Sequence, residues 1–334
     1  MKYQQHATEG EVSAAYEQTQ SIERALNAVI FGQEDLVKLV ITGLLARGNV
    51  LLEGLPGLGK TELVKTLSKV VSLDTKRVQF TPDLLPGDIT GNPVLQEKDG
   101  ERQFVFQPGP IFTNIMLADE INRASPKTQS ALLEAMQEQK VTVLGETHAL
   151  PNPFFVLATQ NPIDLEGTYP LPEAQLDRFL FKLNIERNTV ATMERIITSR
   201  ELGVEPTADQ VIDGQKLADL LQLVRKIYLP EPVANYIARV VDATHDSHAA
   251  QLLKYGASPR AALSLASAAK AYALMHNRTN ASFEDVKHLA PSVLRHRVQL
   301  DYAAKMENKS ADDIVAEILA EIPFQSTATP KTLV

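Results

Sequence analysis

The chain has 334 residues, which at about 150 residues per domain predicts two domains, and its 44% of apolar residues excludes a disordered chain. Its 33 basic and 41 acidic residues give a net charge of −8, which argues against non-specific nucleic-acid binding over the whole surface. Because the sequence contains no cysteine, disulfide bonds, thiolate metal sites and thiol catalysis are excluded as well.

Residues 1–20 form a polar N-terminal segment without the apolar stretch of a secretory signal, so we expect a cytoplasmic protein. The longest apolar region, Leu36 to Leu55, is interrupted by Lys38, Arg47, Asn49 and Glu53. Such a region cannot insert into a bilayer, and membrane contact would therefore need a partner.

Strands and helices are predicted to alternate over residues 21–186. Apolar residues at helical spacing indicate two helices before a first strand at Val50–Leu52, and a helix from about Lys60 to Val71 follows that strand. Further strands are expected at Val78–Phe80, Ile115–Ala118, Phe154–Thr159 and Phe179–Ile185, with a helix at Pro126–Gln137. This alternation predicts an α/β fold, in which helices cover both faces of a parallel sheet.

Two stretches interrupt the alternation. Residues 84–110 are rich in proline and glycine and predict an inserted loop that projects from the domain. In residues 140–151, the run Val141-Thr-Val-Leu followed by Gly145 predicts a hairpin.

After about residue 186 no further strands are predicted. We expect a linker over residues 187–211, followed by a smaller, all-helical domain over residues 212–322, where apolar stripes recur at helical spacing. Residues 323–334 are polar and predict a mobile tail.

The segment from Gly54 to Thr61 matches the phosphate-binding pattern G-x-x-x-x-G-K-[ST], and it lies between a predicted strand and a predicted helix, as this motif requires. Its glycines let backbone N–H groups surround phosphates. Lys60 would reach the β- and γ-phosphates, while the Thr61 hydroxyl would bind Mg²⁺ at the helix N-terminus. The expected nucleotide-binding residues are Gly54, Pro56, Gly57, Leu58, Gly59, Lys60, Thr61 and Glu62.

The apolar strand at Ile115–Ala118 ends in two carboxylates, Asp119 and Glu120. In an open α/β sheet, ligands bind outside the carboxyl ends of the strands. We therefore expect Asp119 to hold Mg²⁺ through its water shell and Glu120 to orient and polarise an attacking water.

The strand at Phe154–Thr159 is followed by Gln160-Asn161-Pro162, which puts a neutral amide beside the expected γ-phosphate. Asn161 can donate a hydrogen bond to phosphate or water without adding charge, although an asparagine before proline is also common in turns. The run from Asn161 to Asp164 has some likeness to the guanine-specificity motif N-K-x-D but lacks its lysine, which favours ATP over GTP.

Taken in order, these motifs resemble the AAA+ ATPase superfamily. The runs Asp119-Glu-Ile-Asn-Arg-Ala124 and Ala158-Thr-Gln-Asn-Pro162 are similar to its MoxR branch, and the likeness covers about residues 20–300. Supporting runs are Phe31-Gly-Gln33, Asp177-Arg-Phe179 and Gly256-Ala-Ser-Pro-Arg260. The two inserted stretches resemble the helix-2 insert and the hairpin before sensor 1 in this clade.

The resemblance implies a role for several residues. It places Phe31 and Gly32 near the adenine and makes Asn161 the sensor-1 residue, Arg178 the arginine finger and Arg260 the sensor-2 arginine, with Arg123 as a second candidate for a contact across subunits. Arginines suit such roles because phosphoryl transfer is catalysed mainly by positioning and charge stabilisation. The sequence leaves open whether Arg260 acts within its own subunit or on a neighbour.

The resemblance also implies a function, that of an ATP-hydrolysing ring motor. We expect a hexamer, assembled in the presence of ATP, that remodels or matures other proteins together with a partner carrying a von Willebrand A domain. The histidines lack the spacing of a metal site, so Mg²⁺ bound with the nucleotide is the only metal expected.

Two alternatives remain at this point. A nucleic-acid motor is supported only by residues 254–305, which contain eight Lys/Arg and three Asp/Glu, and the 6% of aromatic residues argues against a base-stacking groove. A scaffold that binds nucleotide without turnover is disfavoured by Glu120.

Overall fold

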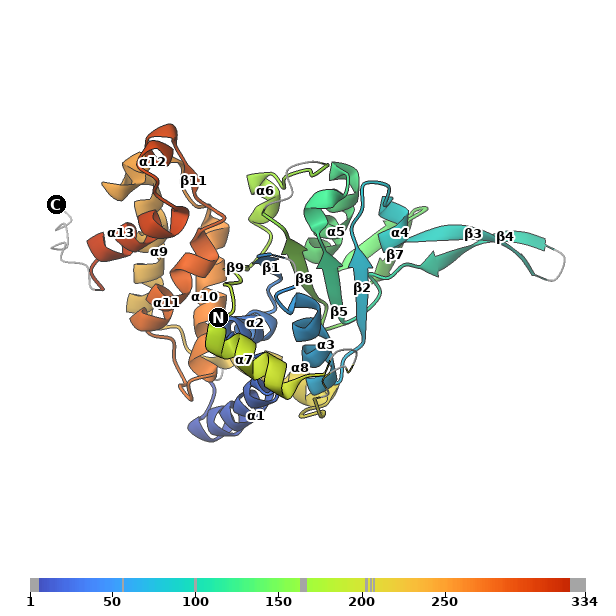
Figure 1. Cartoon of the computed structure of the whole chain (residues 1–334), viewed down its shortest axis with the longest axis horizontal. Coiled ribbons are helices and arrows are strands. Elements are labelled where there is room, and N and C mark those ends of the chain that lie inside the picture. The colour runs from blue at the N-terminus through green and yellow to red at the C-terminus, as the bar shows by residue number, and fades with distance from the viewer. Residues whose placement is uncertain are drawn as a thin grey trace, which may run out of the picture. The chain divides into compact units, whose positions relative to one another are not determined.

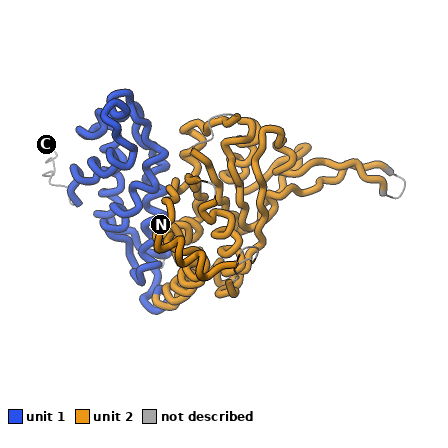
Figure 2. Tube along the Cα trace, in the orientation of Figure 1, with its two compact units in different colours: residues 1–12, 225–334 blue, residues 13–224 orange. Residues whose placement is uncertain are grey.

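The computed structural model describes residues 6–55, 57–98, 101–162, 167–201, 204, 206 and 208–324 (Figure 1). The chain divides into two compact units, a larger one at Ser13–Val224 and a smaller one that combines Met1–Val12 with Arg225–Val334 (Figure 2). None of the helices in the described ranges is both long and apolar enough to cross a membrane.

The larger unit is built on a parallel sheet of five strands in the order β2-β5-β8-β1-β9. The strands are β1 (Val50–Glu53), β2 (Thr75–Gln79), β5 (Ile115–Asp119), β8 (Phe155–Gln160) and β9 (Phe181–Asn184). The central strands are almost entirely buried because helices cover the sheet on both faces. The predicted α/β class is therefore confirmed.

The topology explains how the helices reach both faces. The chain passes from β1 to β2 in one direction across the sheet and returns from β5 to β8 in the other. Because such crossovers are right-handed, α3 (Lys60–Val70) and α5 (Pro126–Glu138) lie on opposite faces. On one face α5 packs on Met116 and Val156, and on the other α2 (Glu34–Leu45) approaches so closely that a Cβ on Gly43 would lie 2.7 Å from Val50 Cγ2.

Parallel pairing aligns the carboxyl ends of the strands at one edge of the sheet. Gln79 lies beside Asp119, and Glu53 lies beside Gln160. The P-loop leaves the sheet at this same edge, directly after β1. The register therefore brings together polar residues that are far apart in the sequence.

The predicted insert forms α4 (Pro86–Thr90) and a two-stranded arm of β3 (Gly91–Lys98) and β4 (Glu101–Pro108), which extends beyond the sheet (Figure 1). At the root of the arm, the Phe106 ring stacks on His148 with 4.1 Å between ring centroids. Farther out, Leu95 pairs with Phe104, and these side chains are 52% and 68% exposed. The arm thus presents one pair of apolar side chains to solvent near the middle of its length.

The second interruption is a tight hairpin of β6 (Lys140–Val143) and β7 (Glu146–Ala149). Its two turn residues, Leu144 and Gly145, have φ angles of 51° and 84°. Positive φ at both positions is the geometry of a type I′ turn, whose twist matches that of the flanking strands.

Three helices contain residues that the sequence does not predict to be helical. Helix α1 (Glu9–Asn27) covers much of the polar segment 1–20 and buries Val12, Ala15, Thr19, Ile22 and Leu26 at alternating spacings of three and four residues. Helix α7 (Val190–Ser199) lies within the predicted linker 187–211 and starts with a Thr189 N-cap. The short helix α6 (Glu173–Leu176) precedes β9.

The smaller unit contains the helices α9 (Glu231–Asp246), α10 (Pro259–Leu274), α11 (Phe283–Leu294), α12 (Tyr302–Met306) and α13 (Ala311–Glu321). In addition, β10 (Leu253–Tyr255) and β11 (Gln299–Leu300) form a short antiparallel pair that the apolar spacing does not reveal. Helix α8 (Gly214–Lys226) crosses the boundary, so the compact units divide at 224/225, C-terminal to the predicted start at residue 212.

Candidate nucleotide site

A cleft of about 470 Å³ opens at the carboxyl edge of the sheet. It is lined by Gly57, Gly59, Lys60, Thr61, Glu62, Arg77, Gln79, Asp119, Glu120, Asn161 and Arg200. The fold thus brings the P-loop, the acidic pair after β5 and the amide after β8 to one place, as an open sheet does at the carboxyl ends of its strands.

The P-loop has the backbone that its glycines permit. Gly57 and Gly59 both have a φ of 80°, a left-handed conformation that other residues adopt only at a cost. Gly54 is required for a different reason, because a Cβ there would lie 2.9 Å from Ile185 Cβ. Pro56 lies outside the described residues.

Lys60 points back into its own loop. Its Nζ donates a hydrogen bond of 2.5 Å to the carbonyl oxygen of Gly54. Burial lowers the pKa of Lys60 below its ordinary value of 10.5, and this effect outweighs the opposing influence of Asp119, Glu120 and Glu53. A phosphate group beside Lys60 would favour the charged ammonium and offset the cost of its burial.

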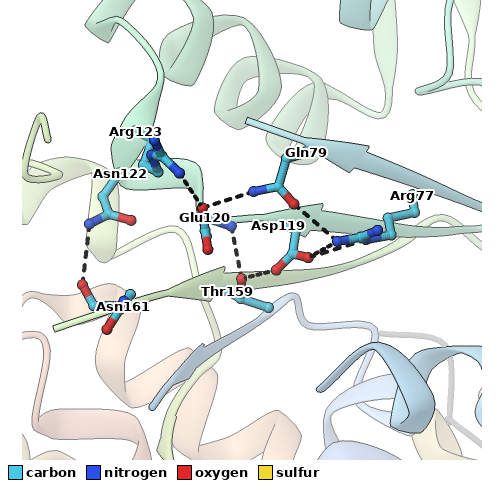
Figure 3. A network of polar contacts seen from close by, with 8 residues as sticks. All are labelled: Arg77, Gln79, Asp119, Glu120, Asn122, Arg123, Thr159 and Asn161. Carbon is cyan, nitrogen blue, oxygen red and sulfur yellow. Dashed lines mark hydrogen bonds and ion pairs between the residues drawn. The ribbon is translucent and has the colours of Figure 1, made fainter. Parts of the chain in front are cut away.

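Fixed donors hold both carboxylates of the acidic pair (Figure 3). Thr159 Oγ1 donates to Asp119 Oδ1 at 2.6 Å, and the Arg77 guanidinium donates to Asp119 Oδ2 at 2.7 and 3.2 Å. Glu120 Oε2 accepts from Gln79 Nε2 at 2.9 Å and from Arg123 Nη1 at 3.1 Å. The two carboxylates therefore have defined orientations at the end of β5.

The backbone of Glu120 is unusual. Its φ and ψ are 56° and 52°, a left-handed conformation that costs a residue with a side chain about 1 to 3 kcal/mol. Its N–H donates at 2.8 Å to Thr159 Oγ1, the same hydroxyl that donates to Asp119. Thr159 thus fixes both acidic residues, and the turn after Asp119 directs the Glu120 side chain into the cleft.

Asn161 is 9% exposed and lies at the cleft wall next to Glu120. Its carbonyl oxygen accepts a hydrogen bond of 3.4 Å from Asn122 Nδ2, in the short helix η1 (Ile121–Arg123). The segments that follow β5 and β8 are therefore tied together beside the cleft (Figure 3).

The remaining predicted site residues lie outside the cleft lining. Arg123 is ion-paired with Glu120, whereas Arg178 is half-buried after α6, and within the described part of the chain its guanidinium forms no hydrogen bond or ion pair. Arg260 is exposed in the first turn of α10, in the smaller unit. Leu58 is a half-buried loop residue, and Phe31 and Gly32 pack against α7.

The sequence interpretation misses four residues of the site: Arg77, Gln79, Thr159 and Arg200. Arg77 and Gln79 are two residues apart on β2 and so share one face of the strand. That spacing is a usable signal only once β2 is known to pair with β5. Arg200 follows α7 in the predicted linker and has no comparable signal.

The parallel five-stranded sheet, the P-loop after β1 and the acidic pair after β5 define a P-loop ATPase of the AAA+ class. Residues 49–181 match the model of the ATPase family associated with various cellular activities (AAA), and residues 245–318 match the AAA lid domain. The chain belongs to the MoxR family of AAA+ ATPases, as its relatives show.

The chain is 42% identical to the chaperone MoxR1 of Mycobacterium tuberculosis, over 93% of this chain and 83% of that protein. It is 46% identical to the YeaC protein of Bacillus subtilis, over 91% and 94%. Its structure is also similar to the crystal structure of a Cytophaga hutchinsonii protein that is named as an expected ATPase, with a TM-score of 0.86. The two chains are 37% identical, and the match covers 93% of this chain and 96% of that one.

Proposed function

We propose that this chain binds and hydrolyses ATP with Mg²⁺ in the cleft and uses the energy to remodel or mature other proteins. One observation carries the first part: Lys60, Thr61, Asp119 and Glu120 line the same cleft although β1 and β5 are far apart in the sequence. The MoxR1 relative, which is named a chaperone, supports the second part.

The donor set fits Mg²⁺ held mainly through the nucleotide. The cleft offers the Thr61 hydroxyl and the Asp119 carboxylate, which are the hard oxygen ligands that Mg²⁺ prefers. Within the described ranges, no group of three or more acidic, histidine or cysteine side chains could hold a metal by itself. When bound, Mg²⁺ would neutralise charge that develops on the β- and γ-phosphates.

The residues of the chain would supply the remaining chemistry. Lys60 would exchange the Gly54 carbonyl for phosphate oxygens, and the N–H groups of the loop would surround them. Glu120 would accept a proton from the attacking water, once its carboxylate is released by Gln79 or Arg123. Asn161 would hydrogen-bond the γ-phosphate or that water.

We infer an ATP-promoted hexamer in which Arg178 reaches the site of a neighbouring subunit. Two facts support this: Arg178 lies outside the lining of its own cleft, and its guanidinium is unpaired within the described part of the chain. A guanidinium supplied by a neighbour would bind charge that exists only when the γ-phosphate is present, which links assembly to ATP. By family resemblance, the partner would carry a von Willebrand A domain.

The structure gives little support to a nucleic-acid motor. In the basic segment 254–305, Arg278 is ion-paired with Asp285 and Arg295 with Asp312, while Arg297 is only 8% exposed. Three of the eight cations of this segment are therefore ion-paired or buried, which weakens its only support, an exposed basic surface for a phosphate backbone.

The direct test of the proposal is turnover by the purified chain. We expect it to release phosphate from ATP and to lose this activity when a chelator removes Mg²⁺, because the triphosphate charge would no longer be neutralised. A coupled phosphate-release assay measures both results. Binding of MgATP without any turnover would instead indicate a nucleotide-gated scaffold.

The arm is expected to act on protein partners and not on ATP. Replacing Leu95–Phe104 by a two-residue Asn-Gly turn would join the paired residues Val94 and Val105 and would keep the root at Phe106. We expect this variant to hydrolyse ATP within about twofold of the wild-type rate but to lose its effect on partner proteins, since the removed residues lie outside the cleft lining.

The readouts are the ATPase rate, the oligomer mass and partner pull-down on the same preparation. A double substitution, Leu95→Ser with Phe104→Ser, keeps the arm at full length and tests its exposed apolar residues alone. Loss of assembly together with ATPase would show that the arm serves the subunit interface, and unchanged processing of partners would refute its proposed role.

A further inference from the structure

Arg200 is the residue of the cleft lining that comes from neither the P-loop nor the ends of the sheet strands. It follows the last turn of α7 and is half-buried. Its Nη2 donates a hydrogen bond to the carbonyl oxygen of Val29, and its guanidinium lies 5.5 Å from the centre of the Phe31 ring. The side chain therefore reaches back from α7 toward the start of the sheet domain and borders the cleft.

The charge environment of Arg200 differs from that of Arg77, the other arginine of the cleft lining. Arg77 is neutralised by Asp119 at 2.7 Å, whereas Arg200 forms no ion pair with any residue that the structure describes. Its hydrogen-bond partner is a neutral carbonyl, which is a weaker acceptor than a phosphate oxygen. A half-buried guanidinium without a counter-charge, facing a cleft suited to phosphates, is stabilised when an anion enters.

Neighbouring contacts hold the base of this side chain in place. A Cβ on Gly32 would lie 2.5 Å from Thr192 Oγ1, so the segment after Val29 packs directly against α7. Gln33 Nε2 also donates at 3.1 Å to the carbonyl oxygen of Glu186, just before α7. The segment after Val29 and the helix that precedes Arg200 are thus held together beside the cleft.

We propose that Arg200 is a phosphate-contacting residue of the nucleotide site, supplied by the subunit that binds the nucleotide. On binding, its guanidinium exchanges the Val29 carbonyl for a phosphate oxygen. The inference rests on the proposed nucleotide function, and it adds a cationic contact that is contributed by the segment following α7.

Arg195 provides a matched control. It lies on α7, the helix that Arg200 follows, and its guanidinium is 4.2 Å from the centre of the same Phe31 ring, but it is exposed and is not a lining residue of the cleft. The two arginines therefore share an aromatic partner and a charge, and they differ in whether they line the cleft.

The experiment measures the Kd of MgATP and MgADP by calorimetry for the full chain, at low and high salt. We expect Arg200→Ala to weaken binding about 10- to 100-fold, as for the loss of a hydrogen bond between charged groups, and to reduce the salt dependence of Kd. Arg195→Ala should bind within about twofold of wild type. A loss confined to MgATP would place the contact at the γ-phosphate, and an equal loss for MgADP would place it at the α- or β-phosphate.

Arg200→Lys guards against misfolding of the alanine variant, because it keeps the charge and the apolar stem but not the planar fork of donors. We expect it to bind several-fold more weakly than wild type. Wild-type affinity in either Arg200 variant, or an equal loss in Arg195→Ala, would overturn the inference. If the wild-type chain itself bound no MgATP, the proposed function would fail instead, so the two failures are distinguishable.

Discussion

Replacing Lys60 by alanine should abolish nucleotide binding, whereas Glu120→Gln should leave binding intact and slow hydrolysis by about 10² to 10⁴. The first change removes the cation that would bind the phosphates, which in the structure bonds to the neutral carbonyl of Gly54. The second keeps the side-chain shape and an oxygen that can accept from Gln79 and Arg123, but it removes the base that takes a proton from water.

Calorimetry of MgATP binding and single-turnover hydrolysis separate the two effects. Lys69→Ala is a suitable control, because Lys69 is an exposed residue on the same helix as Lys60 and lies outside the cleft lining. Normal turnover by the Glu120→Gln protein would show that another group activates the water, and the left-handed backbone of Glu120 would then need a different explanation.

Arg178→Ala should slow hydrolysis by about 10³ to 10⁵, equivalent to roughly 4 to 7 kcal/mol of transition-state stabilisation, if this arginine acts across subunits. Binding of ATP to the isolated chain should change little, because Arg178 is not part of the lining of its own cleft. The expected defect is therefore in the rate of ATP hydrolysis by the assembled protein and not in its affinity for ATP.

Mixing two inactive proteins tests the geometry. An Arg178→Ala subunit keeps Glu120, and a Glu120→Gln subunit keeps Arg178, so a mixed ring contains some complete sites. Recovered ATPase activity supports action across subunits, with light scattering used to confirm that the mixed protein is assembled. No recovery in assembled protein would point to Arg123, or to a structural role for Arg178.

The sequence predicts those parts of the site that are local in the chain. The P-loop and the pair Asp119-Glu120 are contiguous runs, and the strands that precede them are short apolar stretches with clear ends. The contacts of Arg77 and Gln79 depend on pairing between β2 and β5, which composition and spacing do not specify. The sequence indicates only that Thr159 ends a strand, although its hydroxyl fixes both carboxylates.

The fold was predicted best where burial is continuous. The sequence does not indicate most of helix α1, because its buried positions include Ala15 and Thr19, which are not distinctive in a polar segment. Helix α7 has no fully buried residue, so its sequence lacks the buried apolar stripe that indicates a helix, and the segment is predicted to be a linker. The pair β10 and β11 is too short for an alternating pattern to be recognised.

The smaller unit joins two stretches of chain that the ribosome produces at very different times. Within this unit, the Ala7 N–H donates to the Lys226 carbonyl oxygen at 3.1 Å, Glu11 pairs with Lys226 at 3.7 Å, and the His6 ring lies edge-on to Tyr228. At about 5 to 20 residues per second, synthesis separates these partners by an interval on the order of ten to forty seconds. Residues 13–224 are complete while most of residues 225–334 are still to be made, so we expect the nucleotide-binding core to fold first during translation, while the first turn of α1 waits for its partners.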